Sequence, residues 1–182
     1  MFADMEGFTS LSERLGPKEA YAIMDQVYEI LIHKVHDYEG TVNEFTGDGI
    51  MALFGAPIAL EDAFQRAIRS AYAIHREMTR FSNKLNREKL AISPLKMRIG
   101  IHTGPVVVGT LGNDLRVEFK AVGDTVNLAS RIEGLAIPGS TYVSEDTFKL
   151  TEGLFRFEAL GQYAVKGKAE AVWAAVFKTA ID

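Results

Sequence analysis

The stretch of this chain that most constrains its fold reads Asn43-Glu44-Phe45-Thr46-Gly47-Asp48-Gly49-Ile50-Met51-Ala52-Leu53-Phe54-Gly55. Apolar and aromatic residues lie on both sides of Gly47-Asp48-Gly49, and such residues favour the pleated surface of a β-strand. We therefore predict two short strands joined by a tight turn, in which the two glycines supply positive φ angles. The turn presents the Asp48 carboxylate at its tip, which suits a hard cation, although an ordinary Asp-Gly hairpin turn explains the same residues.

The composition of the chain excludes several classes of function. Residues 1–182 are enough for a single domain with a sizeable core, and 47% hydrophobic with 24% charged residues is typical of a globular protein. The formal net charge of −4 gives no reason to expect nucleic acid binding. No apolar run approaches the roughly 18 residues of a membrane helix, so we expect no membrane contact by this domain. The absence of cysteine excludes disulfides, thiolate zinc sites and cysteine nucleophiles, and it fits a cytoplasmic location.

A second candidate carboxylate lies near the start of the chain. Residues 1–5 read as the back half of a strand that contains Asp4, so we expect the domain to be taken from a longer multidomain protein. A glycine-containing loop then leads into a helix for which Thr9 or Ser10 is a suitable cap. Free backbone N–H groups at such a helix start, at Phe8 and Thr9, can bind phosphate, but a plain strand-loop-helix connection is the commoner case.

Two longer helices are predicted to form the scaffold. Proline suits the first helical position at residue 17, and apolar residues recur at helical spacing through residue 35. A second apolar stripe runs through 64–81, and the polar segment 83–89 is expected to be a surface loop. His33 and His36 lie three apart on the first helix, but no third ligand accompanies them, so we assign them no metal.

The second half of the chain is rich in strands, predicted within 95–104, where the strand ends at a turn, and at 105–111, 116–122, 141–143, 155–160, 163–165 and 172–177. Alternation within 116–122 places Arg116, Glu118 and Lys120 on one face. Helices interleaved with mostly antiparallel strands predict an α+β fold of one sheet with packed helices.

A helix predicted at 126–133 carries two polar side chains on one side. Asn127 and Arg131 are four residues apart and therefore project together. An amide and a guanidinium aimed together suit an anion, although a solvated helix face is the simpler explanation.

Five motifs, taken in order, resemble those of the class III adenylate/guanylate cyclase catalytic domain: Phe2-Ala3-Asp4-Met5-Glu6-Gly7-Phe8-Thr9, Gly47-Asp48-Gly49, Arg98-Ile99-Gly100-Ile101-His102-Thr103-Gly104, Gly123-Asp124-Thr125-Val126-Asn127-Leu128-Ala129-Ser130-Arg131 and Val165-Lys166-Gly167-Lys168. Each alone is weakly specific, but together they cover nearly the whole chain. The resemblance implies a ferredoxin-like, antiparallel-rich sheet with packed helices and a dimerisation arm, which we place at the hairpin around 112–114. It also implies a head-to-tail homodimer with active sites at the subunit interface, and a covalently linked regulatory domain in the full protein.

The resemblance assigns three groups of residues to the active site, namely metal-binding Asp4, Asp48 and the backbone carbonyl of Met5, phosphate-binding Phe8, Thr9, Arg98 and Lys166, and catalytic Asn127 and Arg131. The last two residues and Lys166 come from the other subunit in this arrangement.

The implied reaction is the conversion of ATP or GTP into a 3′,5′-cyclic nucleotide and pyrophosphate, for intracellular signalling. The ribose 3′-oxygen attacks the α-phosphate in line. Two Mg²⁺ or Mn²⁺ ions would activate that oxygen and neutralise the phosphates. Arg131 would stabilise charge on the α-phosphate, and Asn127 would orient the ribose.

The base-recognition positions depart from the usual pattern. Typical adenylate cyclases place a Lys four residues before the second metal-binding Asp, and an Asp or Thr three residues before the Gly that precedes the Asn/Arg helix. Here these positions hold Glu44 and Lys120. An ionised Glu44 could accept from guanine N1–H and N2, and Lys120 could donate to O6, so we predict GTP over ATP.

Three alternatives remain at this stage. Glu44 and Lys120 could pair with each other and narrow the base pocket. The chain could be a catalytically silent nucleotide-binding homologue, although such a domain would be expected to have lost Asp4, Asp48 or Arg131, which are all present. A diguanylate cyclase ranks last, because its Gly-Gly-acidic-Glu-Phe signature is missing.

Overall fold

The computed structural model describes residues 1–88, 92–164 and 170–181. The helices and strands in chain order are β1 (Phe2–Met5), α1 (Phe8–Leu15), α2 (Pro17–Asp37), β2 (Thr41–Phe45), β3 (Gly49–Leu53), α3 (Ala63–Arg87), β4 (Met97–Ile101), β5 (Val107–Asn113), β6 (Arg116–Val122), α4 (Asp124–Leu135), β7 (Ser140–Ser144), α5 (Glu145–Leu150), β8 (Phe155–Tyr163) and β9 (Val172–Ala180).

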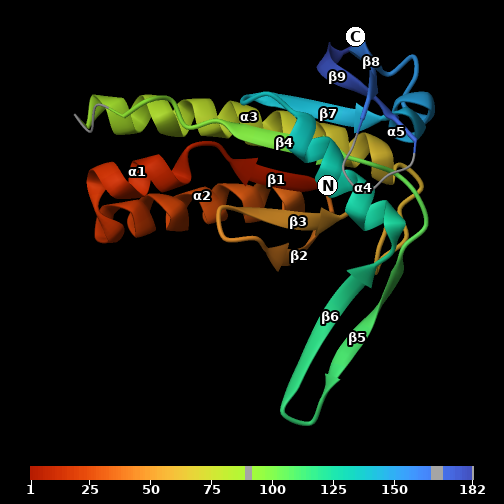
Figure 1. The fold of residues 1–182 in the computed structure, drawn as a ribbon, viewed down its shortest axis with the longest axis horizontal. Helices are drawn as coiled ribbons and strands as arrows, with labels where there is room; N and C mark the ends of the chain where they lie inside the picture. The colour runs from red at the N-terminus through yellow and green to blue at the C-terminus, as the bar shows by residue number, and fades with distance from the viewer. Residues whose placement is uncertain (89–91, 165–169, 182) are drawn as a thin grey trace.

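Seven of the strands form one mixed sheet in the order β2-β3-β1-β4-β7-β9-β8 (Figure 1). All neighbours pair antiparallel except β4 and β7, which are parallel. The strand β1 therefore lies between the β2–β3 hairpin and β4. In the sequence, 43 residues lie between Met5 at the end of β1 and Gly49 at the start of β3. This placement brings the two candidate carboxylates to the same part of the sheet.

The main core lies between the sheet and the helices α2 and α3. Successive strand residues point to opposite faces, so Met97, Ile99 and Ile101 of β4 enter this core while the residues between them face the other way. On the opposite face α4 packs against β4. Gly100 permits that contact, because a Cβ there would lie 2.2 Å from the backbone nitrogen of Glu133.

The strands β5 and β6 form a separate two-stranded sheet that projects from the body of the domain (Figure 1). Asn113 closes its turn, because its Oδ1 accepts hydrogen bonds from the backbone nitrogens of Leu115 and Arg116 at 3.0 and 3.3 Å. This hairpin is where the dimerisation arm was predicted. Its exposed apolar side chains are Val107, Leu111, Leu115, Val117 and Val122.

Several predicted boundaries were wrong. The segment 83–89 was expected to be a loop, but α3 continues through Arg87 because Leu85 extends its buried stripe. Neither Thr9 nor Ser10 caps α1, which begins at Phe8 after a left-handed Gly7 and has no side-chain cap. One strand, β8, replaces the two strands predicted within 155–165, at least as far as the described residues extend, and α5 was not predicted.

Candidate functional site

Two hydrogen bonds hold the Asp48 turn against β1, and a third connects it to α2. The backbone nitrogen of Met5 donates to the Asp48 carbonyl at 2.9 Å, and the Thr46 hydroxyl donates to the Asp4 carboxylate at 3.3 Å. From α2, the Tyr28 hydroxyl donates to the Gly47 carbonyl at 2.6 Å. The structure thus brings Asp4 and Asp48 together, as the motifs predicted.

The two glycines of this turn have different roles. Gly47 has a φ of 90°, as predicted for a tight turn. Gly49 was also expected to have a positive φ and is not among the residues that do. It is required for space instead, because it pairs directly with Asp4 and a Cβ there would lie 1.9 Å from the Ala3 carbonyl oxygen.

The electrostatics of the pair favour a cation. Burial, together with the neighbouring Asp48 carboxylate, raises the pKa of Asp4 to about 6, against the opposing effects of Thr46 and Arg98. Two close carboxylates disfavour joint ionisation unless a positive charge is present. Carboxylate and carbonyl oxygens are also the donors that Mg²⁺ prefers.

No third acidic side chain completes a cage. Among the described residues, no group of three or more His, Cys, Asp or Glu is arranged to hold a metal ion. Mg²⁺ usually keeps several waters and binds through one or two carboxylates together with substrate phosphates, so the donor set of Asp4 and Asp48 fits that mode. The Met5 carbonyl stays a predicted third donor.

Arg98 of β4 lies opposite Asp4 of β1 in the antiparallel pairing, but its guanidinium forms an ion pair with Glu6. Its Nε is buried and has no hydrogen-bond partner. Glu6 was not among the predicted site residues; it follows Asp4 by two residues, just beyond the end of β1. Phe8 and Thr9 begin α1 immediately beyond it.

A further carboxylate, Glu133, faces this side of the sheet from α4. Burial, together with the charge of Asp4, raises the pKa of Glu133 to about 7, against the opposing charge of Arg98. Sequence reasoning missed Glu133, because a partly buried carboxylate on an amphipathic helix has no distinguishing local pattern.

The predicted catalytic pair, Asn127 and Arg131, is carried by α4. Asn127 is exposed and Arg131 is half-buried, whereas Ala129 and Ile132 of the same helix are buried. Within the described part of the chain, neither polar side chain has a hydrogen bond or ion pair. The two residues therefore lie on one helix as predicted, and their functional groups have no partner among the described residues.

The predicted base-recognition residues meet in a groove of about 600 Å³ between β2 and β6. The Lys120 Nζ lies 3.7 Å from Glu44 and 3.2 Å from Glu118. Glu118 is also paired with Arg116, and hydrogen bonds from Lys120 and Arg116 lower the pKa of Glu118. The predicted one-face arrangement of these β6 residues is confirmed, but the role of Glu118 was missed.

Asn43 sits beside Glu44 at an irregularity in the β2–β3 register. Its side-chain oxygen and nitrogen are both buried without a hydrogen-bond partner. The last predicted site residue, Lys166, lies outside the described residues, as does the rest of its motif from Val165 to Lys168.

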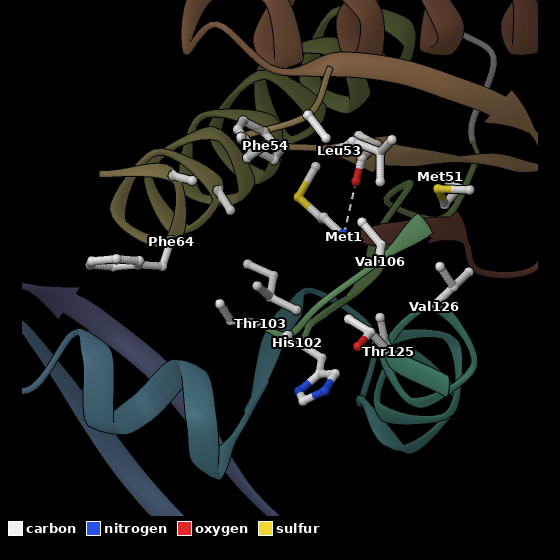
Figure 2. Close-up of a pocket in the computed structure, with 18 of the residues that line it drawn as sticks. Met1, Met51, Leu53, Phe54, Phe64, His102, Thr103, Val106, Thr125 and Val126 are labelled. Carbon is white, nitrogen blue, oxygen red and sulfur yellow. Dashed lines mark hydrogen bonds between the residues drawn. The ribbon is translucent and has the colours of Figure 1, made fainter. Parts of the chain in front are cut away.

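A separate pocket of about 330 Å³ lies beside the start of β1 (Figure 2). At its edge the Met1 backbone nitrogen donates to the Ala52 carbonyl at 2.9 Å. The lining is largely apolar and includes His102 and Thr125, but no predicted site residue. We therefore place the candidate site at the carboxylates and not at this pocket.

No helix among residues 1–88, 92–164 and 170–181 combines the length and apolar character needed to cross a membrane.

Comparisons with known proteins agree with the motifs. Adenylate cyclase 1 of Rhizobium meliloti is 32% identical over 174 residues, which are 94% of this chain and 26% of that protein. Guanylate cyclase 2G of Rattus norvegicus is 31% identical over 93% of this chain and 15% of its own length. The chain thus spans about a quarter or less of these two relatives.

The fold has a close counterpart among solved structures. The guanylate cyclase domain of RhGC from Catenaria anguillulae, crystallised in complex with GTP, matches with a TM-score of 0.89 and 28% identity, over 99% of this chain and 94% of that one. The predicted cyclase fold is confirmed by this match. Residues 1–176 match the family described as the adenylate and guanylate cyclase catalytic domain, and the chain belongs to that family.

Proposed function

We propose that this chain is a nucleotide cyclase that converts a purine nucleoside triphosphate into its 3′,5′-cyclic monophosphate and pyrophosphate. The observation that carries the proposal is the convergence of two carboxylates, Asp4 in β1 and Asp48 in the turn before β3, which the fold brings close enough for Asp48 to raise the pKa of Asp4. In the reaction, a bond forms between the ribose 3′-oxygen and the α-phosphorus. The bond to the β-phosphate bridging oxygen breaks, and pyrophosphate leaves.

Asp4 and Asp48, with the Met5 carbonyl, would hold two Mg²⁺ or Mn²⁺ ions. When bound, these ions supply charge neutralisation to the triphosphate and favour ionisation of the 3′-hydroxyl. The role of the chain is to orient the carboxylates, and the Met5, Thr46 and Tyr28 hydrogen bonds support this role because they fix both strands of the site.

The active form is a head-to-tail homodimer. The side chains of Asn127 and Arg131 have no partner among the described residues. They lie on the part of the α4 surface that its buried residues, Ala129 and Ile132, do not occupy. In the dimer they would reach the partner's nucleotide, where Arg131 stabilises charge on the α-phosphate and Asn127 orients the ribose. The exposed apolar side chains of the β5–β6 arm support the dimer, because such a surface normally marks an interface.

GTP is the proposed substrate. Lys120 lies closer to Glu118 than to Glu44, so Glu118, itself held by Arg116, neutralises much of the Lys120 charge. The Glu44 carboxylate therefore keeps acceptor capacity for guanine N1–H and N2, and Lys120 keeps donors for O6.

A second candidate function is nucleotide binding without turnover. The observation that favours it is the 3.7 Å approach of Lys120 to Glu44, which narrows the groove on the base-recognition face.

We also propose that a covalently linked domain regulates this cyclase and that the protein is located in the cytoplasm.

The test is to measure cGMP and cAMP formation by the purified chain with Mn²⁺ over a range of protein concentrations. Cyclase activity with cGMP in excess, and a specific activity that rises with concentration, is expected. Exclusive cAMP formation would refute the assignment of Glu44. In an active protein, Asp48→Ala is expected to remove product formation, and an Asp37→Ala variant of the same charge change serves as control.

A further inference from the structure

Arg98, the proposed triphosphate ligand, is already engaged by an anion of its own chain. Its guanidinium is ion-paired with the Glu6 carboxylate. Across the β1–β4 ladder Arg98 pairs in register with Asp4, so Glu6, whose backbone nitrogen donates to the Lys96 carbonyl at 2.9 Å, is the diagonal neighbour. Long side chains reach such diagonal partners in antiparallel sheets. Arg98 therefore neutralises Glu6 and leaves Asp4 to the cation site.

The Glu6 carboxylate also lies at the start of a helix that lacks a cap. Gly7 is the residue before α1, and no side chain accepts a hydrogen bond from the first turn. The first backbone N–H groups of a helix have no partner within the helix, and they favour negative charge. Glu6 thus combines a guanidinium partner with a position next to Phe8 and Thr9, which is the same pair of features proposed to bind the triphosphate.

The geometry points to Glu6 as an internal competitor of the substrate's triphosphate group. When the triphosphate binds, the Glu6 carboxylate leaves Arg98, and a phosphate oxygen takes its place. The buried Arg98 Nε, which has no partner, adds a donor that a phosphate oxygen can use. This inference rests on the proposed function only in its choice of ligand.

The size of the effect follows from the exposure of the pair. The side chains of Arg98 and Glu6 are 33% and 42% exposed. Water therefore screens their attraction, and the strength of the ion pair is that of a surface salt bridge. Removing such a competitor is expected to tighten triphosphate binding by about twofold to fivefold, which is the change in affinity that corresponds to the strength of one solvent-screened ion pair.

The experiment measures the affinity of inorganic tripolyphosphate by calorimetry, with Mn²⁺ present, for the wild-type chain and Glu6→Gln. Tripolyphosphate cannot be cyclised, so the result does not depend on turnover. The matched control is Glu13→Gln, which removes the same charge from an exposed position on α1. We expect Glu6→Gln to bind about twofold to fivefold more tightly and Glu13→Gln to bind as the wild type does.

A double-mutant cycle separates competition from a general charge effect. In an Arg98→Gln background, Glu6→Gln is expected to lose its effect, because the guanidinium under competition is gone. Weaker or unchanged binding by Glu6→Gln would overturn the inference, since a residue that supports Arg98 lowers affinity when removed. So would an equal gain in the Arg98→Gln background. If the wild type binds tripolyphosphate but forms no cyclic nucleotide, the proposed function fails and the cycle still tests Glu6.

Discussion

Gly100→Ala is the substitution that most directly tests how the fold positions α4, the helix that carries the proposed catalytic residues. A Cβ at this position would lie 2.2 Å from the Glu133 backbone nitrogen, 2.5 Å from its Cα and 2.7 Å from the Ala129 carbonyl oxygen. All three atoms belong to the α4 backbone, so no side chain can rotate to relieve the contact. The helix itself must retreat from β4.

The magnitude follows from these distances. Ordinary van der Waals contact begins near 3.4 Å, so α4 must move by about 1 Å or more. Overpacking of this kind typically costs about 1–3 kcal/mol, which corresponds to a Tm lower by roughly 2–12 °C in a domain of this size. Because α4 carries Asn127 and Arg131, the same 1 Å displacement is expected to lower the cyclisation rate by about 10²-fold.

The assays are thermal unfolding and cyclic nucleotide formation at saturating Mn²⁺. Gly134→Ala on the same helix is the matched control, because a Cβ there meets nothing within 4 Å. Replacing this helical glycine is expected to stabilise the chain by roughly 0.5–1 kcal/mol and leave the rate unchanged. If Gly100→Ala unfolds at the wild-type temperature and keeps the wild-type rate, the argument that Gly100 sets the position of α4 is wrong.

Three further predictions concern individual side chains. Tyr28→Phe removes only the hydrogen bond to Gly47, so a loss of about 0.5–1.5 kcal/mol of unfolding free energy and weaker Mn²⁺ binding are expected, whereas Tyr21→Phe at an exposed position of α2 should change neither. Burial lowers the pKa of His75 from 6.5 to about 4, so below pH 6.5 the unfolded chain binds a proton that the folded chain does not. The unfolding free energy should therefore be unaffected by His75 above pH 6.5 and fall by about 1.4 kcal/mol per pH unit between 6.5 and 4, and urea titrations of the wild type and His75→Gln check the slope. Because the pKa of Asp4 is raised to about 6, protons compete with the cation, and calorimetry should find Mn²⁺ affinity falling about tenfold per unit below pH 6; pH-independent binding would contradict the metal role of Asp4.

The elements with strong local patterns were predicted correctly. The β2–β3 hairpin follows from Gly47 and its apolar flanks, and α2 follows from Pro17 and helical spacing. Errors arose where tertiary contacts outweigh local composition. The polar segment after Phe81 stays helical because Leu85 finds a place in the core, and Gly49 is needed for the close approach of β1 and not for its φ angle.

The sequence alone determined which chemical groups this domain possesses and the family to which it belongs. Asp4, Asp48, Asn127 and Arg131 stand in motifs whose order along the chain is specific, and that order needs no coordinates to read.

Only the tertiary structure determined which charge pairs with which. Arg98 has carboxylates at Asp4 and Glu6 within its reach and is paired with Glu6, and Lys120 lies nearer to Glu118 than to Glu44. The physical reason is that differences of about an ångström in the separation of two charges decide which ion pair forms. Strand register sets those separations, and residue types alone do not.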